Sequence, residues 1–285
     1  MNNEVHDSDF DSVLVLLPGS TITPEGIRLL CRISNFDHFI ILNKLKIKLP
    51  QILCPINSHE IAGSSGDQLD VLRINFLAVK KIFFERPFNP FMVLSCRFGK
   101  KRSRFYTSHH HPVEIYNEEK ILLIEGDYKT TDEKAAHMFG NDVDFDMGHQ
   151  KVKAVYSKDL KTYRIVMLYQ VMDPEPLVFI DRSIDYSFLE SAKKMTVTAN
   201  FNALKLQLEK TFCRKADQTM LHHGYVLKQV QNISEKKAKG LKLNKKKEII
   251  TTAISNEIAT NRMSRLLFYQ WCKDNGWVKR IIPGV

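Results

Sequence analysis

The sequence predicts an α+β fold: a mixed, largely antiparallel β-sheet region with short helices, followed by a helical C-terminal third. Two observations predict this division. Short apolar segments separated by proline, glycine and aspartate recur between residues 12 and 182, which is typical of strands. From about residue 184 such breaks become rare, and alanine, lysine, leucine and glutamate become frequent, which favours helices. With 285 residues and 44% hydrophobic content, the chain can bury the core of one large domain or two modest ones.

The first elements follow an acidic N-terminus, residues 1–11, which we expect to be flexible. Residues 12–18 form an apolar run that predicts a strand. Residues 23–33 predict a helix, because Thr23 suits the N-cap position and Pro24 suits the first turn.

Two further segments of this half are rich in apolar residues. Residues 38–49 pass from an apolar run into alternation at Leu45, Ile47 and Leu49, which predicts a strand. Residues 67–84 fit either one face of a helix or a set of strands, and the sequence leaves both interpretations open.

The strand pattern is clearest between residues 90 and 181. Short, β-rich apolar segments predict strands at 90–98, 120–126, 151–157, 162–171 and 176–181. Because the turn-like residues 158–161 lie between the third and fourth of these segments, we expect those two to form a β-hairpin.

Three helices are predicted in the last third of the chain, at 187–194, 201–212 and 254–272. The second carries one buried face at helical spacing, formed by Phe201, Leu204, Leu208 and Phe212. In the third, we expect Trp271 in the core, and Asn275–Gly276 as the C-terminal cap.

These elements suggest three parts. They are a flexible acidic N-terminus (1–11), an α+β body (12–182) and a basic helical region packed on that body (183–285). No apolar run reaches the ~18–20 residues that a membrane helix needs, and the N-terminus has no secretory pattern. Five widely spaced cysteines predict buried thiols rather than disulfides or a zinc site. We therefore expect an intracellular protein, nuclear or cytoplasmic, without a cofactor.

The net charge of +10 is unevenly distributed along the chain. Residues 1–182 hold 23 Lys and Arg against 24 Asp and Glu, a net charge of −1. Residues 183–285 hold 19 against 8, a net charge of +11. A segregated excess of this kind indicates a surface that meets an anionic partner.

The excess is densest between Lys228 and Lys247, which contains eight lysines, the single acid Glu235 and no aromatic residue. Lysine neutralises phosphates well and recognises bases poorly, so this composition favours salt-dependent binding to a nucleic-acid backbone. A solvated surface, an anionic membrane and an acidic protein remain alternatives. The predicted phosphate contacts are Lys236, Lys237, Lys239, Lys242, Lys245, Lys246, Lys247, Arg262 and Arg265.

A second basic stretch, RFGKKRSRFYTSHHHP, occupies residues 97–112. Its position between two apolar segments predicts an exposed hairpin tip. As an alternative, its cations and rings form a second nucleic-acid contact, through Lys100, Lys101, Arg102, Arg104 and Tyr106. In a third interpretation, the histidines bind a metal ion.

Residues 109–129 combine a turn that carries a carboxylate, an apolar strand, and then Asp127 and Lys129. Alternate residues share a face of an extended strand, and carboxylates there can hold a divalent metal that activates water. Over about 20 of 285 residues the stretch resembles the site of PD-(D/E)xK nucleases. The resemblance implies Glu114 and Asp127 as carboxylates, Lys129 as their partner, His111 as a further ligand, and Mg²⁺ or Mn²⁺ as cofactor.

The leading hypothesis is a non-catalytic protein that binds the DNA or RNA backbone through its basic C-terminal region. The first alternative, from the enzyme class, is the divalent-metal nuclease. The second is a structural or scaffold protein that binds a protein partner.

Overall fold

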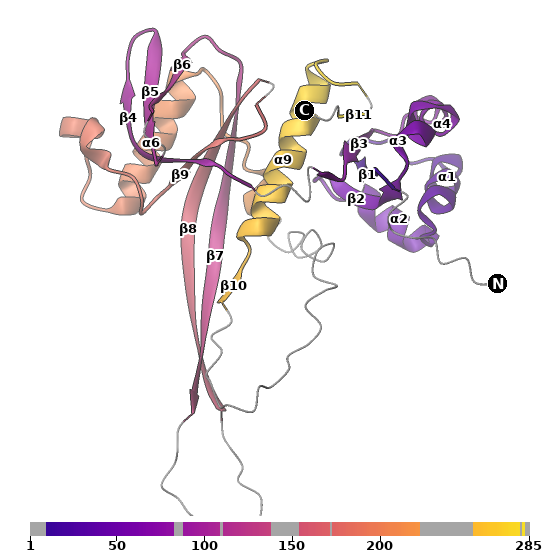
Figure 1. The fold of residues 1–285 in the computed structure, drawn as a ribbon, viewed down its shortest axis with the longest axis horizontal. Helices are drawn as coiled ribbons and strands as arrows, with labels where there is room; N and C mark the ends of the chain where they lie inside the picture. The colour runs from indigo at the N-terminus through magenta and orange to yellow at the C-terminus, as the bar shows by residue number, and fades with distance from the viewer. Residues whose placement is uncertain are drawn as a thin grey trace, which may run out of the picture.

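The computed structural model describes residues 10–82, 88–108, 111–137, 154–171, 173–222, 253–279 and 281–282. Two β-sheets lie on either side of the long helix α9 (Glu257–Asp274), and further helices cover their outer faces (Figure 1). Most strand pairs are antiparallel. The α+β class and the mixed, largely antiparallel character of the sheets are therefore confirmed.

The smaller sheet has the strand order β11-β3-β1-β2. Its strands are β1 (Ser12–Leu16), β2 (Gln51–Ile56), β3 (Phe76–Lys80) and β11 (Ile281–Ile282). The central strand β1 pairs antiparallel with β2 and β3, and β11 adds to β3 in parallel. All five residues of β1 are buried, because both faces of the sheet are covered.

Four helices belong to this smaller sheet: α1 (Pro24–Ser34), α2 (His38–Leu45), α3 (Ser58–Ala62) and α4 (Ser64–Val71). Leu14 and Leu16 of β1 pack with them in one core, whereas Val15 faces the core that contains α9. The predicted helix at 23–33 is confirmed, and Thr23 caps it by accepting a hydrogen bond from the Gly26 N–H at 3.1 Å.

One prediction for this half is wrong, and one that the sequence left open is resolved. Residues 38–49 are not a strand, because most of the segment is helix α2, whose first turn is capped by Asp37. Residues 67–84 combine both open interpretations, since they contain the end of α4 and then strand β3.

The larger sheet has the order β10-β7-β8-β9-β4-β5-β6. Its strands are β4 (Phe91–Phe98), β5 (Arg102–Thr107), β6 (Val113–Tyr116), β7 (Ile121–His137), β8 (Ala154–Gln170), β9 (Leu177–Ile180) and β10 (Ala253–Ser255). The contact between β4 and β9 is parallel, and the remaining pairs are antiparallel.

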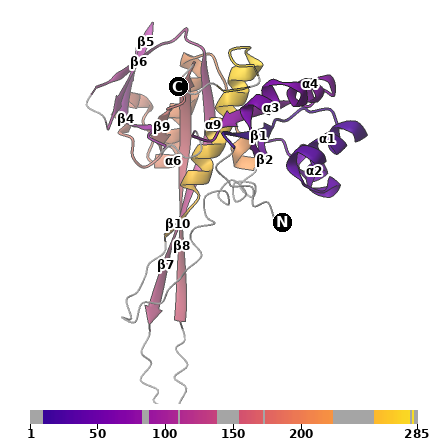
Figure 2. The same cartoon turned by 45° about the vertical axis from the view of Figure 1, so that its right-hand side comes forward.

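Strands β7 and β8 pair along 17 residues each and extend beyond the rest of the sheet as a two-stranded ribbon (Figures 1 and 2). The predicted hairpin between 151–157 and 162–171 is therefore wrong. Strand β8 continues through 158–161, where Lys158 pairs with Glu133 and Lys161 with Thr130. These polar residues belong to the projecting part of a strand, not to a turn.

The outer face of the larger sheet is covered by α6 (Val197–Thr211). Its predicted buried face is confirmed, since Phe201, Leu204, Leu208 and Phe212 lie in a core with Val166 and other residues of the sheet. The short 3-10 helix η1 (Tyr186–Ala192) precedes α6, and α7 (Thr219–His222) follows it. The layers therefore run from α1–α4 through the smaller sheet, α9 and the larger sheet to α6.

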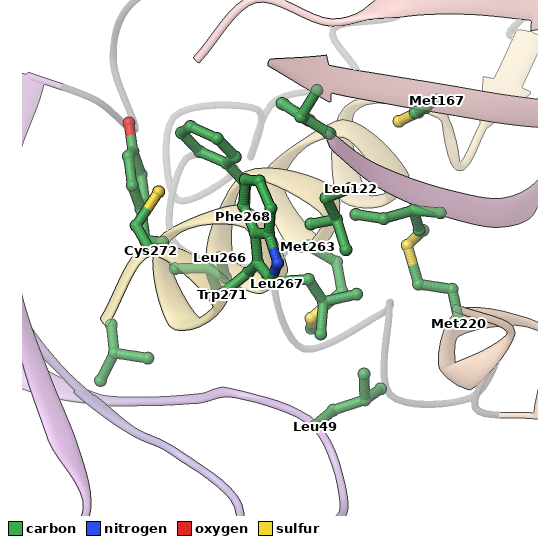
Figure 3. Packing of buried hydrophobic residues seen from close by; sticks show 14 of the residues in the cluster. Leu49, Leu122, Met167, Met220, Met263, Leu266, Leu267, Phe268, Trp271 and Cys272 are labelled. Atoms are coloured by element: carbon green, nitrogen blue, oxygen red, sulfur yellow. The ribbon is translucent and has the colours of Figure 1, made fainter. Parts of the chain in front are cut away.

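Helix α9 packs against both sheets, and its core cluster is drawn in Figure 3. Trp271 is only 7% exposed, which confirms its place in the core. The helix ends at the predicted cap, where Asn275 is followed by Gly276 with φ of 74°.

None of the five cysteines, all of which the structure describes, forms a disulfide. Cys54, Cys96 and Cys272 are buried, whereas Cys213 is exposed. No helix in the described part of the chain combines the length and the apolar character needed to cross a bilayer.

Candidate nucleic-acid interface

Strands β4, β5 and β6 present one exposed face that carries most of the basic stretch singled out in the sequence. On β5, Arg102, Arg104 and Tyr106 are exposed, while Ser103 and Phe105 are fully buried. This is the period-two pattern of a strand with one face in a core and one in water. The inner face packs toward α6, so the arginines point away from the core.

The strand register brings residues from three strands together on this face. Arg97 of β4 lies opposite Arg104, and Arg102 lies opposite Tyr116 of β6. The Arg102 guanidinium lies 4.8 Å from the centroid of the Tyr116 ring, a cation–π contact. Tyr106 and Tyr116 are 40% and 52% exposed, so both offer surface on which a base can stack.

The tip of the β4–β5 hairpin carries Lys100 and Lys101, both exposed. Asn117 holds this tip, because its side-chain N–H groups donate to the carbonyls of Gly99 and Lys100 at 2.9 and 3.2 Å. A Cβ atom at Gly99 would lie 2.6 Å from the Arg102 carbonyl oxygen, so the turn requires glycine. The two lysines are therefore displayed by a fixed turn, as the hairpin-tip interpretation expected.

Glu114, the first predicted nuclease carboxylate, belongs to this basic face. It accepts hydrogen bonds from Arg104 at 2.5 Å and from Arg102 at 3.4 Å. The hydrogen bond from Arg104, supported by Arg102, lowers the pKa of Glu114. Its carboxylate therefore neutralises part of the arginine charge.

The predicted nuclease residues are not brought together. Glu114 lies on β6, whereas Asp127 and Lys129 lie on β7, and four strands separate β6 from β7 in the sheet. With about 4.8 Å between neighbouring strands, their backbones are on the order of 20 Å apart. One metal ion, whose ligand bonds are about 2 Å long, cannot bridge that gap.

Asp127 instead has other carboxylates near it. Burial raises its pKa most, and Glu125 and Asp181 add to this, while Lys129 and Arg164 oppose it. No group of three or more His, Cys, Asp or Glu residues within the described ranges is arranged to hold a metal ion. His111 is exposed, and its neighbours His109 and His110 lie outside the described residues.

The lysine-rich segment that carried the leading hypothesis falls within residues 223–252, which lie outside the described residues. This applies to Lys236, Lys237, Lys239, Lys242, Lys245, Lys246 and Lys247. Arg262 is described and half-buried on α9.

Arg265 requires a correction. Its guanidinium is buried, forms a 2.6 Å ion pair with Glu175 and lies 4.8 Å from the centroid of the Phe88 ring. A buried cation that already has a carboxylate partner fixes α9 to its surroundings. We therefore remove Arg265 from the predicted phosphate contacts.

Sequence reasoning missed Tyr116 as a member of the basic face. The alternation of Glu114, Ile115 and Tyr116 could have identified the exposed side of the strand. Its contact with Arg102 depends on the pairing of β5 with β6, which the sequence does not specify.

Comparisons of the chain with protein-family models, with curated proteins and with solved structures found no match. The function must therefore be inferred from the residues and their geometry.

Proposed function

We propose that this protein binds nucleic acid without catalysis, and that the exposed face of β4–β6 is one of its contact surfaces. The observation that carries the proposal is the gathering of cations and exposed tyrosine rings on one side of three paired strands. We call this surface the β-face and define it by Arg97, Lys100, Lys101, Arg102, Arg104, Tyr106, Glu114 and Tyr116.

The charge of the β-face suits a phosphate backbone. Five cations and the single carboxylate Glu114 give a net charge of +4. Arginine forms bidentate hydrogen bonds with phosphate, while the tyrosine rings can stack on unpaired bases. The basic C-terminal region, with its net charge of +11, is the second proposed contact, through the lysines predicted above.

Binding of labelled oligonucleotides, followed by fluorescence anisotropy across a range of salt concentrations, tests the proposal. We expect the variant Arg102→Gln/Arg104→Gln to bind less tightly and to show a shallower salt dependence. Each lost phosphate contact lowers the slope of log K against log salt by about 0.7–0.9. The matched control is Arg28→Gln/Arg32→Gln, which removes two exposed arginines from α1 and should change neither quantity.

A second variant separates the two proposed surfaces. Charge reversal of Lys245, Lys246 and Lys247 to glutamate should weaken binding independently of the β-face, because these residues contribute to a different basic segment. Absence of binding by the unmodified protein at low salt would reject the proposal and favour the scaffold alternative. Binding that survives both sets of substitutions would equally contradict it.

A further inference from the structure

Two tyrosines of the β-face expose much of their surface to solvent. Tyr106 on β5 is 40% exposed and Tyr116 on β6 is 52% exposed, whereas the preceding residues Phe105 and Ile115 are fully buried. Neither tyrosine pairs with another aromatic ring among the described residues. Single exposed rings are common on protein surfaces, but these two share a face with the arginines of the β-face.

The strand register determines how far apart the two tyrosines are attached. Tyr116 lies opposite Arg102, and Tyr106 lies four residues beyond Arg102 on β5. At about 3.3 Å per residue, the two positions are about 13 Å apart along the strand. Neighbouring bases in one strand of a duplex are only about 3.4 Å apart. One base therefore cannot stack on both rings, and the two tyrosines meet separate bases.

A row of charged residues lies between the two ring positions. Arg104 is midway between Arg102 and Tyr106 on β5, and it lies opposite Arg97 on β4 and Glu114 on β6. Glu114 accepts hydrogen bonds from Arg104 and Arg102, so both guanidinium groups are held on this face. A strand that reaches from one tyrosine to the other crosses this row, where arginine can bind its phosphates.

The position at Tyr116 combines a ring with a guanidinium group. The Arg102 guanidinium lies over the Tyr116 ring, 4.8 Å from its centroid. Guanidinium planes stack on bases as aromatic rings do, so the pair forms one stacking position. Tyr106 forms the other position without such a partner among the described residues.

The β-face is too wide to enter a groove of a duplex. Strands β4, β5 and β6 pair side by side, so their backbones alone span about 10 Å, and the side chains add to this. The major groove is about 12 Å wide and admits a helix or a two-stranded ribbon. The β4–β5 tip is not a free ribbon, because Asn117, which follows β6, donates to the carbonyls of Gly99 and Lys100. A duplex, whose bases are already stacked on one another, can therefore meet the cations of this face but not its rings.

We propose that the β-face binds single-stranded nucleic acid. One unpaired base stacks on Tyr106, another stacks on Tyr116, and the phosphates between them bind Arg97 and Arg104. This inference rests on the nucleic-acid binding proposed above and adds the strand state of the ligand. Residues 228–247 contain no aromatic residue, so lysines there would bind the backbone of either form without this preference.

Three labelled probes test the proposal by fluorescence anisotropy: an oligothymidylate long enough to span both rings, an abasic strand of the same length, and the oligothymidylate annealed to its complement. The first two carry the same charge and differ in their bases, so we expect the oligothymidylate to bind more tightly than the abasic strand. Tyr106→Ala/Tyr116→Ala should weaken binding of the oligothymidylate by about fivefold or more. The abasic strand and the duplex should bind this variant as they bind the unmodified protein.

Control variants separate stacking from charge and from folding. Tyr106→Phe/Tyr116→Phe keeps both rings and should bind like the unmodified protein. Phe39→Ala removes an exposed ring from α2 and should also bind normally. Because tyrosine carries no charge, the alanine variant should keep its salt dependence with the abasic strand, whereas Arg102→Gln/Arg104→Gln should make it shallower. The single variant Tyr106→Ala leaves the contact between Arg102 and Tyr116 in place and should still weaken binding of the oligothymidylate.

The outcomes distinguish this inference from the proposed function. Equal affinity for the oligothymidylate and the abasic strand would overturn the single-strand proposal and leave backbone binding intact. The same conclusion would follow if the alanine variant bound the oligothymidylate as tightly as the unmodified protein, or lost as much affinity for the duplex as for the single strand. Absence of binding to all three probes at low salt would instead reject the nucleic-acid function itself.

Discussion

Glu125 illustrates how single residues hold the larger sheet to its neighbours. Its side chain is 1% exposed and accepts hydrogen bonds from Arg164 at 2.7 Å, Lys205 at 2.9 Å and Gln218 at 2.8 Å. These donors come from β8, α6 and the loop before α7. A buried carboxylate is tolerated only when it is paired and hydrogen-bonded in this way.

Removal of this charge should destabilise the protein. We expect Glu125→Gln to lower the free energy of unfolding by about 2–4 kcal/mol at neutral pH, because Arg164 and Lys205 lose their shared partner. Chemical denaturation measures this loss. The control Glu25→Gln, at an exposed ion pair with Arg28, should cost less than about 1 kcal/mol. Equal losses in the two variants would contradict the role assigned to Glu125.

The stability that the Glu125 carboxylate contributes should depend on pH. Burial alone would raise the pKa of Glu125, but hydrogen bonds from Lys205, Arg164 and Gln218 outweigh it, and the folded pKa lies below the ordinary value of a glutamate. The resulting stability is complete above the unfolded pKa and is lost as pH falls through the folded pKa. The difference in unfolding free energy between wild type and Glu125→Gln should therefore shrink as pH falls below about 4.5. A difference that grows on acidification would contradict this assignment.

At the scale of elements, helix α2 shows where sequence patterns mislead. The apolar run and the alternation at Leu45, Ile47 and Leu49 favoured a strand, yet the chain turns helical at His38. The alternating residues straddle the end of the helix and the segment before β2. Phe39 is 72% exposed and Ile41 is the only buried residue of α2, so apolar content was a poor guide to burial. The signal for a helix was Asp37, which caps the first turn.

Loss of that cap should destabilise α2. Asp37 accepts a hydrogen bond from the Ile40 N–H at 2.9 Å, and we expect Asp37→Ala to cost about 1 kcal/mol of unfolding free energy. Thr23→Ala, which removes the correctly predicted cap of α1, should cost a similar amount. Asn43→Ala, at an exposed position within α2, should cost nothing, because alanine is the better helix former. Chemical denaturation of the three variants checks this order.

Only the first part of strand β7 could be predicted from the sequence, and the rest of the β7–β8 ribbon could not. The apolar residues at the start of β7 lie between two cores and were identified as a strand. Tyr128 still belongs to the core that contains α9, and from Lys129 to Lys134 the sequence is polar. Figure 2 shows the ribbon extending beyond the rest of the sheet. The ribbon continues because β7 pairs with β8, from Asp127 opposite Arg164 to His137 opposite Ala154. The composition of a segment does not reveal which strand it pairs with.

At the scale of the molecule, the C-terminal part of the chain joins the two sheets. Helix α9 shares one core with β1, β3, β7 and β8, and β11 adds to the edge of β3. Lys273 Nζ donates to the Asn75 side chain and to the Phe76 carbonyl, both at 2.7 Å. The sequence predicted a C-terminal helix, but not that it would separate two sheets. These contacts join residues almost 200 positions apart, and local sequence patterns cannot predict contacts between residues so far apart.

Because α9 packs against both sheets, a cavity created in the core around α9 should destabilise both sheets together. Phe268 is 2% exposed and stacks on Tyr169 with ring centroids 4.8 Å apart. We expect Phe268→Ala to cost about 3–5 kcal/mol and to lower hydrogen-exchange protection in β1 and β8 by the same free energy. Phe39→Ala removes an equally large but exposed ring and should have little effect, since its burial is slight. Loss of protection in β8 alone would show that the two sheets unfold independently and that α9 does not couple them.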